Sequence, residues 1–345
     1  MKTDNTKSPI ELIYHLYDLK LKETFKIAHD ERTVQPTVIL EIRYHQYIGF
    51  GEAVATKYYQ VSQTSICNNI EKALPLLQNW RGEKPDLLFD QLLSITQDTF
   101  ATCAIDQALW DIYAQLQNKP LYQLWSDVNT ALPISNYTIG LDSIPTMKRK
   151  LEEFPWPIYK IKLGTEHDLQ IISALREVSD VPFRVDANQA WSVQETIDNS
   201  SLLKKLGVEF IEQPLGKKNW KGMKTLKGKC ALPIIADESC IREQDIDQCM
   251  TVFDGVNIKL TKCGGISAAL RMIKKAKQYS LLTMLGCMTE SSVGITHIAH
   301  LCKLVDFVDM DGALLISNDP AIGISWDGYK VRFQNKNGSG ISLKS

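Results

Sequence analysis

The sequence predicts a (β/α)8-type barrel that follows a smaller α+β domain. The chain has 345 residues, enough for about two domains of about 100–200 residues each. Its first ~125 residues show strand-like runs followed by helical patterns, which is typical of α+β folds. After Pro133, short apolar runs alternate with helical periodicity, and this alternation favours a parallel sheet covered by helices.

The amino-terminal part begins with three strand-like runs and continues with three amphipathic helices. The runs are IELIYHLYDLKL, TVILEIRYH and YIGFGEAVA, and the polar segment KIAHDERTVQ predicts an open loop between the first two. Apolar residues then recur at spacings of three and four in TSICNNIEKALPLLQNW, PDLLFDQLLSIT and ATCAIDQALWDIYAQLQ. We place the first domain at residues 1–127.

Eight apolar runs and the helical stretches between them make up the second part, which we place at residues 128–312. The runs lie near PISNYTIG, IYKIKLG, PFRVDAN, VEFIEQP, PIIADES, GVNIKLT, LLTMLGCM and FVDMDG. Helical stretches such as DLQIISALREVS and ISAALRMIKKAKQYS separate them. Eight such units close most naturally into a barrel, and an open doubly wound sheet is the alternative. The strand-like tail, residues 313–345, is expected to pack back on the first domain.

Composition and charge exclude several classes of function. Hydrophobic residues make up 44% and charged residues 23% of the chain, as in average globular proteins, so disorder is not expected. The chain has 39 Lys+Arg and 40 Asp+Glu, so it lacks the excess positive charge that favours binding to nucleic acid. No apolar run reaches the ~18 residues of a membrane span and no signal peptide is evident, so we expect a cytoplasmic protein. The eight cysteines form no CxxC pair, which indicates reduced thiols.

Three carboxylates end consecutive strands of the predicted barrel. They are Asp186, Glu212 and Asp237. Because the carboxyl ends of barrel strands form the rim where barrel enzymes hold their active sites, the three would gather there. A hard cation would relieve their repulsion, and carboxylates with water are the ligands that Mg²⁺ favours. Each carboxylate taken alone could instead cap a helix or form an ion pair.

Two lysines end strands that lie opposite each other in an eight-stranded barrel. Lys162 ends the second strand and Lys259 the sixth, and Lys160 adds positive charge on the same strand face as Lys162. One lysine could remove an α-proton next to a carbonyl that the metal polarises, and the other could return a proton to the opposite face. The pattern predicts a 1,1-proton transfer through an enolate, whereas an isolated rim lysine would be read as an ion-pair partner. Lys262 is a competing base on the sixth strand.

Five motifs occur in the order found in the enolase superfamily, and the chain resembles its muconate lactonising enzyme-like branch most. They are KIK at 160–162, RVDANQAW at 184–191, IEQP at 211–214, ADES at 236–239 and NIKLTKCGGI at 257–266. AIDQALWD at 104–111 is similar to the first domain-joining helix of that family. The resemblance implies a modified (β/α)7β barrel and an amino-terminal α+β capping domain completed by residues 313–345.

The resemblance also implies a role for each matching residue. The three carboxylates would bind Mg²⁺, and Lys162 and Lys259 would be the acid/base pair. Lys160 would tune Lys162 and belong to the substrate-binding residues. Supporting roles would fall to Asn188 and to Glu238, the latter beside the metal.

Asp309 and Asp311 at the eighth strand resemble the DxD motif of dipeptide epimerases. The resemblance implies that these two aspartates hold the α-ammonium group of a dipeptide, a role for which paired carboxylates are suited. A helix cap or a surface turn is the other interpretation of the pair. The resemblance further implies that Cys287, Met288 and Thr289 contribute backbone groups to the substrate carboxylate.

One position departs from the family pattern. In members that prefer L-Ala-L-Glu, an arginine in the loop after a Phe-Lys-x-Ala stretch pairs with the glutamate side chain of the substrate. Counting from FKIA at 25–28, Asp30 stands at that place, and Arg32 follows two residues later. Asp30 would repel a glutamate, so we expect a neutral or cationic second residue in the substrate; an offset loop would let Arg32 compensate.

The leading hypothesis is a Mg²⁺-dependent dipeptide epimerase, an isomerase that inverts the α-carbon of the second residue of an L-Ala-L-Xaa type dipeptide. An o-succinylbenzoate synthase or a muconate-type cycloisomerase is the alternative on the same fold. A catalytically silent barrel that acts as a binding protein is the alternative of another class. The expected partner is a small dipeptide, with neither nucleic acid nor membrane, and a homo-oligomeric state is left open.

Overall fold

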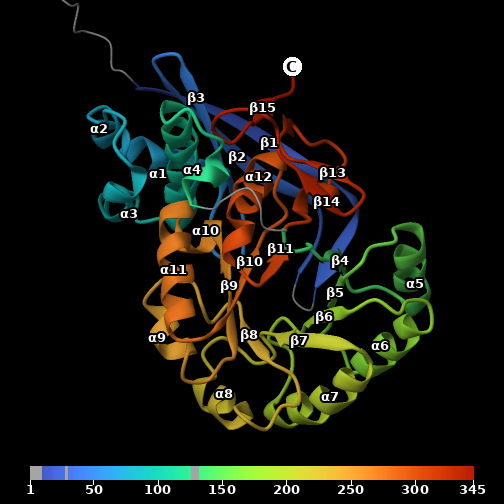
Figure 1. Ribbon diagram of the computed structural model, residues 1–345. Helices are drawn as coiled ribbons and strands as arrows, with labels where there is room; N and C mark the ends of the chain where they lie inside the picture. The colour runs from blue at the N-terminus through green and yellow to red at the C-terminus, as the bar shows by residue number, and fades with distance from the viewer. Residues whose placement is uncertain (1–9, 28–29, 126–131) are drawn as a thin grey trace, which may run out of the picture.

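The computed structural model describes residues 10–27, 30–125 and 132–345. An antiparallel sheet with its helices lies at one end of the molecule, and a curved parallel sheet surrounded by helices lies at the other (Figure 1). The predicted division between residues 127 and 128 falls outside the described residues. Among the helices of the described ranges, none has the length and apolar character required to cross a bilayer.

Three antiparallel strands, in the order β1-β2-β3, form the amino-terminal sheet. They are β1 (Ile10–Ile27), β2 (Asp30–Tyr44) and β3 (Tyr47–Val54). The loop predicted at residues 26–35 is wrong where the structure describes it, because residues 26–27 pair with 30–31 and both strands continue beyond them. Most of the polar side chains at this end of the β1–β2 pair are exposed to solvent, so a paired strand is compatible with them. The register shifts between Lys20 and Phe25.

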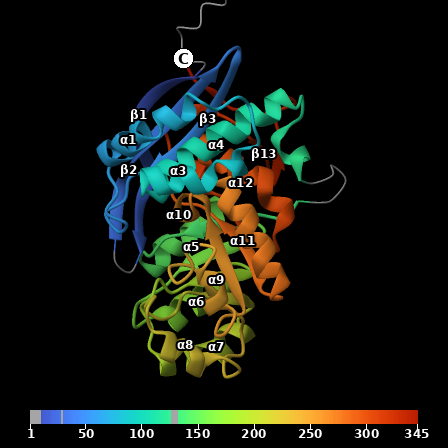
Figure 2. The same ribbon diagram turned by 90° about the vertical axis from the view of Figure 1, so that its left-hand side faces the viewer.

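The predicted helices of the amino-terminal part are confirmed; α1 and α4 pack on the sheet, and α3 packs on α1 and α4 (Figure 2). They are α1 (Gln63–Lys72), α2 (Leu74–Leu77), α3 (Phe89–Thr96) and α4 (Thr99–Leu116). Helix α4 lies so close to β3 that a Cβ on Gly51 would be 1.9 Å from the carbonyl oxygen of Ala104. A glycine is therefore required where the strand meets the helix.

All eight predicted barrel strands are present, and they form one parallel sheet. They are β4 (Tyr137–Ile139), β5 (Tyr159–Lys162), β6 (Phe183–Asp186), β7 (Val208–Glu212), β8 (Ile234–Ala236), β9 (Gly255–Lys259), β10 (Leu282–Gly286) and β11 (Phe307–Asp309). Their order follows the chain without reversal, which excludes a doubly wound sheet. Asn136 N donates to the Val308 carbonyl at 3.3 Å, so the two end strands also meet and nearly close the barrel.

Helices surround the parallel sheet (Figures 1 and 2). They are α5 (Ile144–Glu153), α6 (Asp168–Arg176), α7 (Val193–Lys205), α8 (Trp220–Leu226), α9 (Asp245–Cys249), α10 (Leu260–Cys263), α11 (Ile266–Gln278) and α12 (Ser292–Leu301). Short 3-10 helices lie at Pro85–Leu87, Leu121–Leu124, Cys302–Leu304 and Gly312–Leu314. Helix α10 begins directly after β9, so Lys262 lies on a helix and not on the sixth barrel strand.

Buried carboxylates of the amino-terminal part cap two barrel helices. Asp106 on α4 accepts hydrogen bonds from Ser267 N at 2.9 Å and Ser267 Oγ at 2.5 Å, at the start of α11. Glu52 on β3 accepts from Ser291 N and Ser291 Oγ, and from Gly294 N at 2.9 Å, at the start of α12. Because helix amino termini attract negative charge, these contacts fix the capping sheet over the barrel.

The segment after residue 313 contacts the amino-terminal part. It contains β12 (Ala321–Ile322), β13 (Ser325–Asp327), β14 (Lys330–Arg332) and β15 (Ser342–Leu343). Ser317 N donates to the carbonyl of Lys20, and Ser339 N and Oγ donate to Asp111 on α4. Ala321 and Leu343 of β12 and β15 pack with Ile39 and Phe50 of the amino-terminal sheet, whereas Trp326 of β13 packs against Trp156 of the barrel part.

Candidate active site

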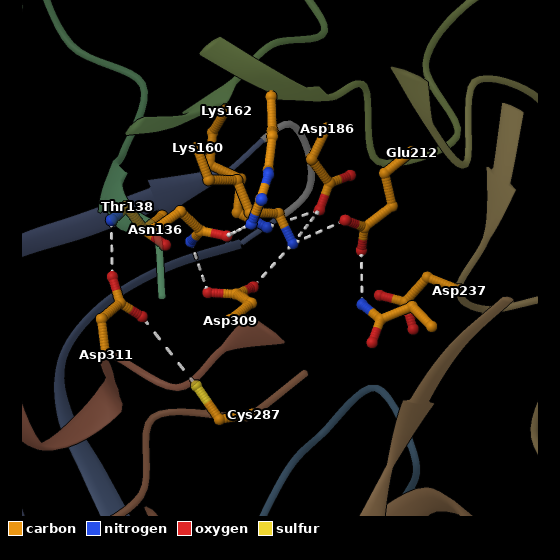
Figure 3. Close-up of polar contacts among 12 residues, drawn as sticks. Asn136, Thr138, Lys160, Lys162, Asp186, Glu212, Asp237, Cys287, Asp309 and Asp311 are labelled. Carbon is orange, nitrogen blue, oxygen red and sulfur yellow. Dashed lines mark hydrogen bonds and ion pairs between the residues drawn. The ribbon is translucent and has the colours of Figure 1, made fainter. Parts of the chain in front are cut away.

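The predicted charged residues lie together at the carboxyl ends of the barrel strands (Figure 3). Lys160 lies within β5, and each of the others is the last residue of its strand or follows it by one or two positions. They come from β5, β6, β7, β8, β9 and β11, so six strands contribute to one small region. This is the rim at which barrels hold their reactive groups.

Asp186, Glu212 and Asp237 form a buried acidic triad. One carboxylate oxygen from each lies within 4.8 Å of the others. Burial and the neighbouring Asp186 carboxylate raise the pKa of Glu212 to about 8. Burial opposes the charge of Asp186, but the ammonium groups of Lys162 and Lys160 outweigh it and lower the pKa of Asp186 to about 2. The triad therefore concentrates hard oxygen donors at one point.

The surroundings of the triad fit a small divalent cation. Asn257 Nδ2 donates to Glu212 Oε1 at 2.9 Å, and Asn188 N donates to Asp186 Oδ1 at 3.0 Å. Glu238 Oε2 is buried with no hydrogen-bond partner among the described residues, and burial and the Asp237 charge raise the pKa of Glu238 to about 7. Three carboxylate ligands held by neighbouring donors are a donor set suited to Mg²⁺.

Lys160 occupies the centre of the cluster and is only 1% exposed. Its Nζ lies 2.8 Å from Glu212 Oε2, 2.9 Å from Asp309 Oδ2 and 3.2 Å from Asp186 Oδ2 (Figure 3). Burial alone would lower the pKa of Lys160, but these carboxylates raise it well above its ordinary value. Lys160 is therefore a fixed positive charge between the triad and Asp309.

Lys162 and Lys259 lie on opposite sides of the triad. Lys162 Nζ is 2.7 Å from Asp186 Oδ2, and Lys259 Nζ is 2.8 Å from Asp237 Oδ2. In the strand order, three strands separate β5 from β9 on one side, and the remaining three separate them on the other. Two ammonium groups thus approach the same acidic centre from opposite directions.

Asp309 and Asp311 converge near Cys287. Oxygens of the two aspartates and the Cys287 sulfur lie within 4.8 Å of one another, and Cys287 Sγ donates to Asp311 Oδ1 at 3.9 Å. Asn136 Nδ2 donates to Asp309 Oδ1 at 2.7 Å, and the Thr138 amide donates to Asp311 (Figure 3). Burial and the Asp309 charge raise the pKa of Asp311 to about 7. The pair has spare acceptor capacity for a cationic group.

In the loop after β10, one backbone donor of the segment expected to bind the substrate carboxylate is already engaged. Met288 N donates to Glu290 Oε1 at 2.8 Å within the loop. Thr289 Oγ1 accepts a hydrogen bond from Arg32 Nη2 at 3.4 Å, so the ribbon of β1 and β2 reaches this loop. Asp30 lies 3.8 Å from Arg32 Nη1, and its side chain is 51% exposed, whereas that of Arg32 is 25% exposed.

A cavity of about 550 Å³ opens between the β1–β2 ribbon and the loops after β4 and β5. It is lined by Lys26, Glu31 and residues 141–144, among others. None of the charged residues of the rim lines it, so this cavity lies beside the candidate site and is not part of it.

Three polar residues of the site region were missed by sequence reasoning. Asn257 contacts Glu212, Asn136 contacts Asp309, and Arg184 Nη1 donates to Asn136 Oδ1 at 3.2 Å. Strand alternation could have found two of them, because Asn257 precedes Lys259 by two residues and Arg184 precedes Asp186 by two. These side chains form a layer below the rim.

Comparisons with known proteins agree with this architecture. Residues 145–339 match the family described as enolase C-terminal domain-like, and residues 10–125 match the mandelate racemase / muconate lactonizing enzyme amino-terminal domain. A Flavobacterium johnsoniae protein named L-Ala-D/L-amino acid epimerase is 46% identical over 335 residues, which cover 97% of this chain and 100% of that protein. A Maribacter protein of the same name is 47% identical over 95% of this chain and 97% of its own length.

Solved structures extend the likeness. The L-Ala-D/L-Glu epimerase from Bacillus subtilis, in a substrate-liganded complex, aligns with a TM-score of 0.91 and 28% identity, over 97% of this chain and 99% of that chain. The dipeptide epimerase from Enterococcus faecalis, complexed with Mg and L-Leu-L-Tyr, aligns with a TM-score of 0.87 and 29% identity, over 96% and 98% of the two chains.

Proposed function

Because the chain belongs to the enolase superfamily, in the branch of mandelate racemase and muconate lactonizing enzyme, we propose that it is a Mg²⁺-dependent epimerase of dipeptides. The reaction moves one proton at the α-carbon of the second residue and leaves all other bonds in place. The enzyme is thus an isomerase, as its relatives named L-Ala-D/L-amino acid epimerase are.

The observation that carries this proposal is the placement of Lys162 and Lys259 on opposite sides of the acidic triad. Inversion requires a base on one face of the α-carbon and an acid on the other. A substrate carboxylate held at the triad would present its α-carbon between the two Nζ atoms. The neutral lysine on one face takes the α-proton, and the protonated lysine on the other face donates one. Reversal of these roles epimerises the other isomer.

Asp186, Glu212 and Asp237 are the residues we propose to hold Mg²⁺. When bound, Mg²⁺ would stabilise the negative charge that develops on the substrate carboxylate as the α-proton leaves. The Enterococcus faecalis neighbour was solved with Mg and a dipeptide, which supports this choice of cation. Lys160 and Asn257 would keep the carboxylates in place.

Asp309 and Asp311 are proposed to bind the α-ammonium group of the first residue. They favour a dipeptide over the substrates of o-succinylbenzoate synthase or a muconate cycloisomerase, because those substrates have no ammonium group. Replacement of both by Asn should abolish dipeptide turnover by removing the charge that pairs with the ammonium. Retained turnover of a dipeptide in the double variant would refute this assignment.

The preference for the second residue depends on two side chains of the β1–β2 ribbon. Asp30 disfavours an acidic side chain, as the sequence predicts, whereas Arg32 favours one and reaches the loop after β10. Turnover of L-Ala-L-Glu and L-Ala-L-Lys by Asp30→Asn and Arg32→Met separates the two influences. If Asp30 dominates, Asp30→Asn raises the Glu/Lys ratio. If Arg32 dominates, Arg32→Met lowers that ratio.

The proposed activity is tested by incubation with a library of L-Ala-L-Xaa dipeptides in D₂O with Mg²⁺. An α-deuterium should enter some dipeptides and both epimers should appear, as read by NMR and mass spectrometry. Lys162→Met and Lys259→Met should each lose about 10²–10⁴-fold in epimerisation and each retain α-proton exchange from only one epimer, opposite for the two variants. Lys274→Met, at an exposed position of α11, is the matched control. The proposal fails if no dipeptide exchanges.

A further inference from the structure

Lys262 is a fully buried lysine at the back of the candidate site. It lies on α10 and is 1% exposed. Its Nζ donates to Asp237 Oδ1, and also to the carbonyl oxygens of Asp237 at 2.6 Å, Cys240 at 3.0 Å and Asn257 at 3.2 Å. An ammonium group has three protons to donate, and four oxygens already surround this one. Lys262 therefore has no proton position free for a substrate.

The two oxygens of Asp237 are held by two different lysines. Oδ1 is held by Lys262, and Oδ2 is held by Lys259 at 2.8 Å. Lys259 has one hydrogen bond given by the structure and its side chain is 11% exposed, whereas Lys262 has four and its side chain is 1% exposed. The Asp237 carboxylate is thus held at Oδ1 by the enclosed Lys262 and at Oδ2 by the more accessible Lys259.

The contacts of Lys262 also join three segments of the rim. Asp237 and Cys240 belong to the turn after β8, and Asn257 lies within β9. A flexible neutral side chain at position 262 would leave three carbonyls and a carboxylate oxygen without their donor in a buried place. Since an uncompensated buried charge is costly, the Asp237 carboxylate would rotate out of its present position.

We propose that Lys262 is a positioning residue that fixes the carboxylate of Asp237 in its place beside Asp186 and Glu212. This inference rests on the proposed function for its catalytic meaning. Its effect on cation binding is independent of the substrate. A positioning role for Lys262 differs from the alternative that the sequence left open, in which Lys262 is itself the base on the sixth strand.

The test compares Lys262→Met and Lys262→Arg with the wild type and with the exposed control Lys274→Met. Mg²⁺ binding is measured by titration calorimetry without substrate, and kcat and KM are then measured at saturating Mg²⁺. Because residues that orient metal ligands contribute about 10–100-fold to metal affinity, Lys262→Met should weaken Mg²⁺ binding by at least 10-fold. Lys262→Arg keeps the charge and should fall between Met and wild type.

At saturating Mg²⁺, Lys262→Met should recover kcat to within about threefold, and it should exchange the α-proton from both epimers, unlike Lys259→Met. Mg²⁺ affinities within twofold of the wild type in the Lys262 variants would overturn the proposal. So would loss of exchange from one epimer only, which would make Lys262 a base. If Lys262→Met does not fold, the Arg variant carries the Mg²⁺ comparison by itself. If the wild type binds Mg²⁺ but turns over no dipeptide, the proposed function is refuted. The Mg²⁺ affinities of the Lys262 variants would still decide whether Lys262 positions Asp237.

Discussion

Replacement of Asp106 by Ala should weaken the connection between the amino-terminal helices and the barrel. Asp106 is fully buried on α4 and accepts two hydrogen bonds from Ser267, the N–H at 2.9 Å and the hydroxyl at 2.5 Å. The variant leaves both donors without an acceptor at a buried helix start. A buried donor without a partner costs about 1–3 kcal/mol, so the gross loss is about 2–6 kcal/mol.

Part of that loss is offset by the burial of the carboxyl group itself. Burial raises the pKa of Asp106 to about 7, which means that the folded protein already carries a desolvation cost that the Ala variant lacks. We therefore expect Asp106→Ala to lower the free energy of unfolding by about 3 kcal/mol. Asp106→Asn keeps one acceptor oxygen and should cost about half as much.

The measurement is urea unfolding at pH 7, followed by circular dichroism and by tryptophan fluorescence. Asp90→Ala is the control, because its side chain is 76% exposed and its ion pair with Arg271 should contribute under about 1 kcal/mol. An Asp106→Ala urea midpoint as close to wild type as that of the control would refute the reasoning.

Three further predictions concern the metal site, the sheet and the pH dependence of stability. Asn257→Leu removes the donor to Glu212 and should weaken Mg²⁺ binding about 10-fold in calorimetry, with the fold intact by circular dichroism. Gly51→Ala should lower the melting temperature or prevent folding, whereas Gly216→Ala, which meets no atom within 4 Å, should leave it nearly unchanged. Burial lowers the pKa of His300 to about 4 from 6.5, so as the pH falls this histidine takes up a proton in the unfolded protein before it does so in the folded protein. The contribution of neutral His300 to stability is fully present above pH 6.5 and falls by up to about 1.4 kcal/mol per pH unit as the pH drops toward 4; His300→Gln should remove this part of the pH dependence in urea titrations at pH 7 and pH 5.

The sequence by itself determined the barrel and its reactive groups. Alternation of apolar runs with helical periodicity located all eight strands, because strands buried on both faces are mostly apolar. The same rule marked Asp186, Glu212 and Lys259 as rim residues. The division of the chain into domains and the role of each site residue stay predictions.

Only the tertiary structure decided which partners these groups have. Local sequence does not show that Lys160 lies between three carboxylates, or that Lys262 leaves the strand and grips Asp237 from behind. It also predicted a loop where β1 and β2 continue as a paired ribbon, because polarity signals exposure and an exposed ribbon is as polar as a loop. These outcomes depend on contacts between residues far apart in the chain, and such contacts arise only when the barrel closes and the amino-terminal sheet covers it.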